Sequence, residues 1–349
     1  MKKRNYKYFD FFAGIGGFKL AAQEIQSTKY KLIHSGYCEI DPIARAVYEE
    51  AHLNGLPIQK INDITTIETA RIKKGIKLNN FDIMFGGFPC QSFSNVGYRK
   101  GLDDERGKLF YNILDILDHK SPKFFVLENV QKLSTIKKGG LLDEMKMALE
   151  MIGKGYHLHV WDLIASDYGL PQKRKRLFFC GVRKDISRKL DISEPTKVNL
   201  NRTKYPTTWH LLEKEKVDEK HFIPSGTRKT VLYKNPKWAG NVDIDNPIAR
   251  PITASMHKWH RANQDNYFSI TYINGNTPLV RPNVNLELEP IRRITPLEGF
   301  RIQGFPDEFV KHMDKLKISY SAQYKLIGNA VPVKLAHKVI NHFLDSYHE

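Results

Sequence analysis

Cys90 is the residue whose type and position best suit covalent chemistry in this sequence. It follows Pro89 at the end of an apolar run, residues 81–86, that is typical of a buried strand. A lone cysteine is more often structural than nucleophilic, but α/β folds build active sites at the carboxyl ends of parallel strands. The polar, glycine-bearing run that follows, residues 92–101, is typical of a loop that can close over a substrate.

Glu128 is a second candidate, because it ends another apolar, strand-like run at residues 123–128. A glutamate in such a place is costly to bury unless it is paired or protonated. It is therefore either a satisfied structural acid or a group kept protonable for chemistry. Arg174 and Arg176 lie in a basic cluster just before a third apolar run. By itself that cluster suits a solvated surface or a phosphate contact better than catalysis.

A glycine-rich segment, residues 10–17 (DFFAGIGG), occurs where a candidate strand turns into a helix. Glycines at such a turn let a ligand approach the backbone closely. Glu39 ends the second candidate strand and is placed to accept hydrogen bonds from a ribose, while Asp63 could bind an adenine amine. A turn without a ligand and a nicotinamide dinucleotide site would also fit the glycines. The Gly-x-Gly-Gly spacing weakens the dinucleotide interpretation.

Alternating strands and helices must position these residues. Strands are predicted at residues 8–12, 31–39, 81–86, 123–128 and 176–182, and helices at 18–25, 43–54, 109–117, 141–151 and 333–347. This alternation favours an α/β fold with a mostly parallel sheet and helices on both faces. Residues 187–290 are rich in Asn, Lys, Pro and Thr, which indicates a separate, irregular, mostly β domain.

The net charge of +17 indicates an anionic partner, with nucleic acid favoured over a membrane surface. The excess of basic residues occurs both within and outside residues 186–322, which favours a basic cleft over a tethered basic tail. No apolar run approaches the roughly 18 to 20 residues of a membrane span, and no signal peptide is expected. Three cysteines fit a reducing compartment, and the absence of Cys-x-x-Cys and His-x-x-x-His motifs argues against a metal site.

Six segments together resemble the DNA (cytosine-5)-methyltransferase family. They are residues 12–17 (FAGIGG), 87–91 (GFPCQ), 128–130 (ENV), Gln172-x-Arg174-x-Arg176, 292–298 (RRITPLE) and 328–332 (GNAVP). Each motif is a weak signal alone, but six in the order of the family are specific. The resemblance spans nearly the whole chain, and residues 187–290 alone fall outside it.

The resemblance implies a discontinuous, Rossmann-like methyltransferase domain, residues 1–186 and 322–349, and a target-recognition domain at residues 187–321. The cofactor it implies is S-adenosylmethionine. Its expected binding residues are Phe12, Gly14, Gly16, Gly17, Glu39, Ile40, Asp63, Ile64, Pro89, Asn329 and Val331.

The resemblance also implies a mechanism in which the Cys90 thiolate adds to C6 of a flipped-out cytosine and makes C5 nucleophilic. Protonated Glu128 would hydrogen-bond to N3, Arg176 would donate to O2, and Arg174 would hold a phosphate or the closed loop. Residues 253–261 (TASMHKWHR) concentrate donors that could read base edges or contact phosphates alone. The expected DNA contacts are Ser92, Ser94, Arg99, His257, Lys258, His260 and Arg261.

The chain is similar to stand-alone bacterial enzymes that modify double-stranded DNA and are paired functionally with a restriction endonuclease. A cytoplasmic monomer without membrane association is expected. A tRNA cytosine-5 methyltransferase is the nearest alternative, but that branch typically bears a Cys-Phe-Thr segment, and no cysteine follows Cys180 here. A catalytically silent DNA-binding relative and a nicotinamide oxidoreductase are weaker hypotheses. The first does not explain why Cys90, Glu128 and both arginines occur together, and the second leaves the charge of +17 unexplained.

Overall fold

The computed structural model describes residues 3–89, 108–187, 191–232 and 242–347. The chain divides into two compact units, each with its own core. The first unit holds Met1–Leu163, Lys175–Thr196 and Ala336–Glu349, and the second holds Ile164–Arg174 and Lys197–Leu335. The second unit thus takes in residues 164–174 and 322–335, which the sequence assigns to the catalytic domain. The functional division into domains stays a prediction.

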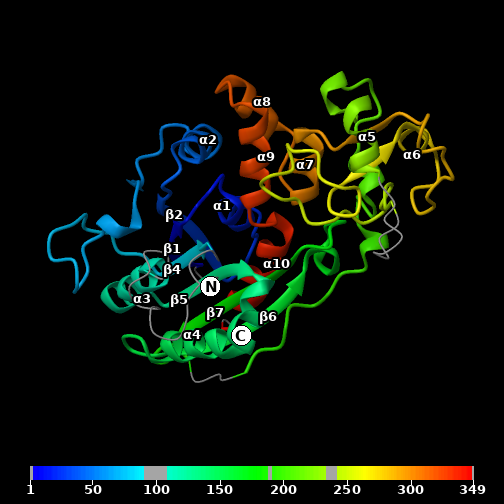
Figure 1. The fold of residues 1–349 in the computed structure, drawn as a ribbon. Helices are drawn as coiled ribbons and strands as arrows, with labels where there is room; N and C mark the ends of the chain where they lie inside the picture. The colour runs from blue at the N-terminus through cyan, green and yellow to red at the C-terminus, as the bar shows by residue number, and fades with distance from the viewer. Residues whose placement is uncertain (1–2, 90–107, 188–190, 233–241, 348–349) are drawn as a thin grey trace. The chain divides into compact units, whose positions relative to one another are not determined.

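The first unit is built on a mostly parallel sheet (Figure 1). Within the described residues its strand order is β3-β2-β1-β4-β5-β7-β6. The strands are β1 Arg4–Phe11, β2 Tyr30–Cys38, β3 Gln59–Ile61, β4 Ile83–Gly87, β5 Phe124–Val130, β6 Tyr156–Ile164 and β7 Lys175–Arg183. Strand β1 pairs in parallel with β2 and β4, β2 with β3, and β4 with β5, whereas β7 is antiparallel to β5. The predicted sheet type is confirmed.

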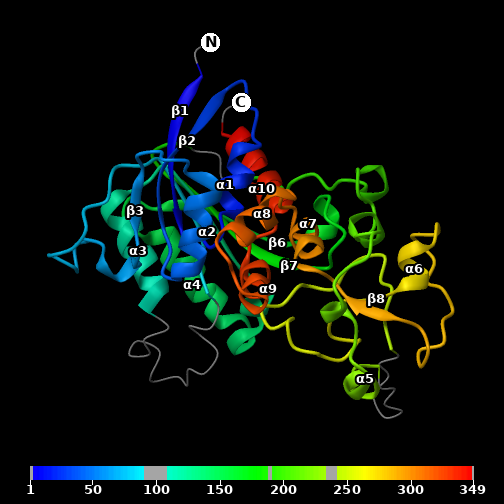
Figure 2. The ribbon, with the colours of Figure 1, turned by 90° about the horizontal axis from the view of Figure 1, so that it is seen from above.

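Helices cover both faces of this sheet (Figure 2). They are α1 Gly17–Gln23, α2 Pro42–His52, α3 Lys108–Lys120, α4 Gly140–Met151 and α10 Val333–Asp345. Apolar side chains of α3 and α4 share one buried cluster with Phe9 and Phe125. On the opposite face, Phe18 of α1 stacks on Phe85. Because both faces are covered, the central strands are apolar along their length, which is why their runs do not alternate.

The second unit contains short helices and little strand. Its described elements are α5 Ser225–Val231, α6 Ile270–Asn274, α7 Pro296–Gln303, α8 Glu308–Lys315, α9 Tyr320–Asn329, and the antiparallel pair β8 Tyr267–Ser269 and β9 Ile291–Arg293. Short 3-10 helices occur in both units: η1 Ile64–Thr66, η3 Gln131–Gly139, η4 Ala165–Tyr168, η5 Leu200–Arg202, η6 Thr208–Leu211 and η7 Glu219–His221.

The mostly β character expected for residues 187–290 is wrong for the described part of that region, where β8 is the one strand among short helices. Side chains replace strand ladders as partners of the main chain there. The Asn266 amide accepts from the Arg250 N–H and donates to the Arg250 carbonyl. The Asn side chain carries both an acceptor and two donors, so it can serve both groups of one main-chain unit. None of the helices in the described part of the chain combines the length and apolar character that crossing a bilayer requires.

The burial of Cys38 and Cys180 predicts which thiols are inert. Burial raises the pKa of both thiols, and the thiolate is the reactive form of cysteine. We expect folded Cys90→Ser protein to show no fast reaction with Ellman's reagent, whereas the same variant in guanidinium chloride should release both remaining thiols. Fast reaction of either thiol in the folded variant would contradict this burial.

Candidate active site

The carboxyl ends of β1 to β5 lie along one edge of the sheet in the first unit. Phe11 at the end of β1 pairs with Cys38 of β2 and Gly86 of β4, and Gly87 of β4 pairs with Glu128 of β5. The segments that follow these strands therefore emerge side by side. Parallel sheets bind their ligands at this edge, and most of the candidate residues predicted from the sequence in the first unit lie there.

The glycine turn after β1 has an unusual backbone. Phe12, Gly14 and Gly16 have φ values of 52°, 54° and 86°. A positive φ is uncommon for a phenylalanine, and strained residues of this kind cluster at functional sites. A Cβ added at Gly14 would meet nothing within 4 Å, so the space beside that residue is open. The turn thus leaves room for a ligand beside Gly14.

Glu39 links the glycine turn to the end of β2. One carboxylate oxygen accepts from the Gly14 N–H at 2.7 Å, and the other accepts from the Asp41 N–H at 2.8 Å. Each oxygen has two acceptor positions, so both can accept a further hydrogen bond. Ile40, the next residue, is 67% exposed, and the Arg45 guanidinium holds its carbonyl at 2.8 Å.

Asp63 occupies the corresponding place after β3. Its carboxylate accepts from the Thr65 N–H at 2.9 Å and caps η1, while Ile64 is buried beneath it. The second candidate acid of the cofactor site is therefore fixed by its own turn, with acceptor positions left over.

A buried polar cluster lies beneath the glycine turn. Asp10 is fully buried, and Tyr48 donates to its carboxylate at 3.4 Å. Burial raises the pKa of Asp10 well above its usual value, and burial lowers the pKa of Lys19 to about 8. Burial, and next the Lys19 charge, lower the pKa of His34 to about 3, so this imidazole stays neutral.

His52 holds the turn from the side of α2. Its Nε2 lies 2.9 Å from the Ile15 carbonyl oxygen, so the Nε2–H tautomer donates to that oxygen. The ring also fills the space over Gly16, where an added Cβ would lie 2.1 Å from Nε2. The interpretation of the sequence missed His52. Its signal is the four-residue spacing of Ala44, Tyr48 and His52 on the buried face of α2.

Glu128 and Arg176 form an ion pair at the same edge. The Arg176 Nε lies 2.5 Å from the Glu128 Oε1, and both side chains are largely buried. They meet because β7 begins where the antiparallel β5 ends, with Arg176 opposite Val130. A carboxyl group and a guanidinium group fixed together can bind one edge of a planar, polar ring through complementary donors and acceptors.

Asn129 fixes the segment that leads to Cys90. Its side-chain amide donates to the Phe88 carbonyl at 3.1 Å, next to the exposed Pro89. Asn129 belongs to one of the six family-like segments, but the sequence did not suggest this contact. Four predicted site residues lie outside the described residues: Cys90, Ser92, Ser94 and Arg99.

Arg174 belongs to the second unit, whereas Glu128 and Arg176 belong to the first. Its buried guanidinium donates to the Ile252 and Gly328 carbonyls, each at 2.7 Å, and to the Ala330 carbonyl at 3.2 Å. These donors are thus engaged by the main chain. The remaining predicted site residues of the second unit are Asn329, Val331, His257, Lys258, His260 and Arg261.

The contact between Gly16 and His52 can be tested by a double-mutant cycle on the free energy of unfolding, measured by urea denaturation. Gly16→Ala should destabilise wild-type protein more than the His52→Ala variant, because the added Cβ strikes the ring in wild type alone. The positive φ strains alanine equally in both backgrounds, so it cancels. We expect a coupling energy of about 1 kcal/mol or more. Additive effects would contradict the contact.

Comparison with known proteins identifies the family. The C-5 cytosine-specific DNA methylase model matches residues 6–344. The type II methyltransferase M1.ScrFI of Lactococcus lactis subsp. cremoris is 34% identical over 354 residues, covering 99% of this chain and 79% of the relative. The type II methyltransferase M.NgoBI of Neisseria gonorrhoeae is 33% identical, covering 94% and 90%.

Solved structures share the fold. The Entamoeba histolytica methyltransferase EhMeth aligns with a TM-score of 0.71 at 21% identity over the full length of both chains. The S. pombe Dnmt2 methyltransferase aligns with a TM-score of 0.69 at 20% identity, covering 98% of this chain and 99% of that one. At this identity the likeness concerns the fold, and it agrees with the expected methyltransferase architecture. The family match over nearly the whole sequence shows that the chain belongs to the C-5 cytosine-specific DNA methylases.

Proposed function

We propose that the protein transfers the methyl group of S-adenosylmethionine to C5 of a cytosine in a specific double-stranded DNA sequence. The observation that carries this proposal is the Glu128–Arg176 pair, fixed beside the strand that leads to Pro89 and Cys90. Relatives named type II methyltransferases support it. We propose further that the enzyme acts as a monomer in the bacterial cytoplasm and protects host DNA from a restriction endonuclease.

The residues around the glycine turn fit S-adenosylmethionine, which supplies an electrophilic methyl group on a sulfonium. The free acceptor positions of Glu39 suit ribose hydroxyls, and those of Asp63 suit the adenine amine. The open space at Gly14 gives room for close approach, and the exposed Ile40 offers apolar surface to a base. Phe12, Gly16, Gly17, Ile64, Pro89, Asn329 and Val331 complete the proposed set by resemblance.

Cys90 has the role of nucleophile in this proposal. Its thiolate adds to C6 of the cytosine, and the electrons of the C5–C6 double bond move toward C5, which then takes the methyl group. Removal of the C5 proton by a base or by water then restores the double bond and expels the sulfur. Carbon 5 needs this help because attack by the unactivated ring would disrupt its π system.

Glu128 and Arg176 would orient the ring and stabilise its developing charge. In this structure the Glu128 carboxylate is ion-paired with Arg176, so in the proposed cycle its carboxyl group takes up a proton before donating to N3. The guanidinium keeps further N–H groups for O2. Arg174 donates to the main-chain carbonyls of residues 252, 328 and 330, so in this proposal it supports the segments that carry them.

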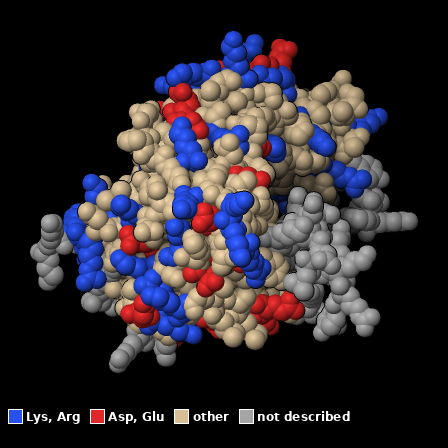
Figure 3. All heavy atoms as spheres, turned by 90° about the vertical axis from the view of Figure 1, so that its left-hand side faces the viewer, with Lys and Arg blue, Asp and Glu red and all other residues tan. Residues whose placement is uncertain are grey.

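DNA binding is supported by the charge of +17, since neutralising phosphates releases counterions. On the face shown in Figure 3, Lys and Arg side chains form several groups, with smaller groups of Asp and Glu between them. In the second unit, Lys258 and Arg261 are exposed and available to DNA. The ring of His260 is engaged by Asp265 at 2.9 Å, and His257 is half-buried. Ser92, Ser94 and Arg99 are proposed to grip the backbone beside the flipped base.

The function is tested by incubating the protein with methyl-labelled S-adenosylmethionine and either unmethylated genomic DNA or tRNA. We expect label in DNA, and bisulfite sequencing should find 5-methylcytosine in one recurring sequence. The Cys90→Ser variant should bind S-adenosylmethionine but transfer no methyl group. Label in tRNA alone would favour the tRNA alternative, and unlabelled DNA and tRNA would refute methyl transfer to either.

Glu128→Gln isolates the proposed proton donor. The amide keeps the size of the side chain but cannot give a proton to N3, so kcat should fall by about 10²- to 10⁴-fold. The dissociation constant of S-adenosylmethionine should stay within error of wild type. Glu150→Gln, an exposed change on α4, is the matched control and should leave kcat unaltered. A Glu128→Gln variant with wild-type kcat would remove Glu128 from the mechanism.

A further inference from the structure

Residues 253–261, the proposed recognition segment, are held by hydrogen bonds to their main-chain carbonyl groups. The carbonyls of Met256 and His257 accept from Arg293, and the carbonyl of His260 accepts from Tyr267. The side chains of Lys258 and Arg261 are exposed. The segment therefore keeps its carbonyl groups for the protein and directs its cationic side chains to solvent.

Arg293 makes the larger share of these contacts. Its Nη1 donates to the Met256 carbonyl at 3.0 Å and to the His257 carbonyl at 2.6 Å, and its side chain is almost fully buried. Its Cζ lies 3.2 Å from the centroid of the Trp259 ring. A planar guanidinium can stack on the ring and donate in its own plane at the same time, whereas an ammonium group cannot.

The neighbouring arginine has a different partner. Arg292 forms a buried, two-point ion pair with Glu298, at 2.6 and 2.8 Å. Its charge is therefore matched within its own motif and stabilises the start of α7. The Arg293 Nη1 group instead donates to main-chain oxygens more than 30 residues earlier in the chain. A contact of that kind determines the shape of a loop.

The two residues that hold the segment, Arg293 and Tyr267, lie side by side on the strand pair β8–β9. Tyr267 and Arg293 are direct partners in this antiparallel ladder. The Tyr267 hydroxyl donates to the His260 carbonyl at 2.7 Å, and its ring lies nearly parallel to Trp259, with centroids 6.2 Å apart. One rung of the ladder therefore holds residues 256, 257, 259 and 260.

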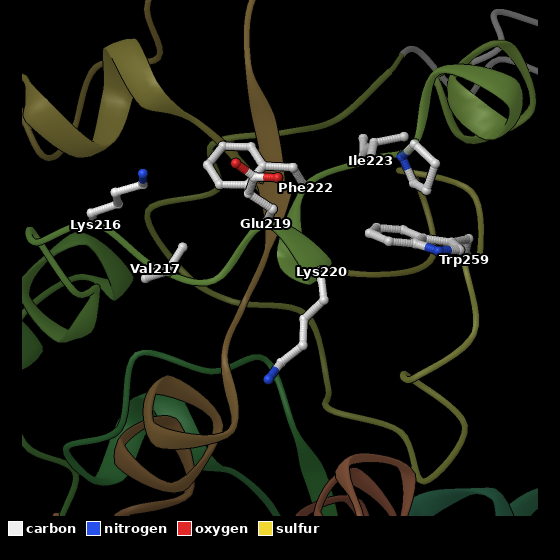
Figure 4. Close-up of a pocket in the computed structure, with 8 residues that line it drawn as sticks. Lys216, Val217, Glu219, Lys220, Phe222, Ile223 and Trp259 are labelled. Atoms are coloured by element: carbon white, nitrogen blue, oxygen red, sulfur yellow. The ribbon is translucent and has the colours of Figure 1, made fainter.

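Trp259 is also a wall of a surface pocket of about 610 Å³. Figure 4 shows its ring across the hollow from Lys216 and Val217. The remaining lining residues are Glu219, Lys220, Phe222, Ile223 and Pro224. Any movement of Trp259 would alter the shape of this surface together with the segment.

We propose that Arg293 is a positioning residue for target recognition, which preforms residues 253–261 so that Lys258 and Arg261 meet DNA in one register. The inference rests on the proposed DNA substrate. A segment that is ordered before binding avoids the entropy cost of being ordered on DNA and rejects sequences that need another shape. Arg293 itself need not touch DNA.

The test compares Arg293→Lys with Arg228→Lys. Arg228 is a matched control, because it also donates to two main-chain carbonyls of the second unit, those of Leu286 and Glu289. For each variant we would measure kcat, KM for DNA, the dissociation constant of S-adenosylmethionine, and, by bisulfite sequencing, the share of methylation outside the wild-type sequence.

Arg293→Lys should raise KM for DNA roughly tenfold, as expected for loss of a buried, charged hydrogen bond. Methylation should spread to sites that differ by one base, while kcat at saturating DNA and cofactor affinity stay near wild type. Arg228→Lys should retain the wild-type sequence preference. Tyr267→Phe, which removes only the bond to His260, should act in the same direction as Arg293→Lys but more weakly.

Two outcomes would overturn the inference: an unchanged KM and sequence preference in Arg293→Lys, or equal changes in Arg228→Lys. If Arg293→Lys does not fold, as judged by circular dichroism, Tyr267→Phe decides, and an unchanged preference there refutes the proposal. Failure of the proposed function looks different, because wild-type protein would then leave DNA unmethylated.

Discussion

The parallel register of β1, β2, β4 and β5 is the constraint on which the rest of the first unit depends. It aligns the ends of four strands, so that the glycine turn, Glu39 and Glu128 all follow the same edge. A slip of one residue would turn each buried side chain to the opposite face. Apolar packing on both faces of the sheet resists that slip. The register that this packing maintains then determines where the polar groups at the edge lie.

Two carboxylates at this edge, those of Glu39 and Glu128, have polar partners. Glu39 satisfies two main-chain N–H groups, and the antiparallel β7 delivers Arg176 to Glu128. A buried carboxylate without such partners would be strongly destabilising. The same arrangement recurs in the second unit, where Arg292 and Glu298 neutralise each other. Glu39, Glu128 and Glu298 therefore each have a partner for their charge.

The sequence revealed features that have local signals. Apolar runs marked β1, β2, β4, β5 and β7, and the glycine spacing marked the turn at residues 12–17. Features that depend on distant partners were hidden. Arg174 lies in a basic run that looks solvated, yet it is buried between the exposed Lys173 and Lys175. This alternation could be expected only if an extended conformation were assumed for the run. The second unit has no clear period, because side chains far apart in sequence satisfy its main chain, as Arg228 does for Leu286.

The bond from Asn129 to the Phe88 carbonyl has a consequence for how this enzyme family can diversify. It joins the strand that carries Glu128 to the chain just before Cys90, beside the Gly87–Glu128 pairing. The spacing between Phe88 and Glu128 is thereby set by the sheet. Residues 253–261, the proposed recognition segment, belong to the other compact unit, so target preference and bond-making chemistry can change independently.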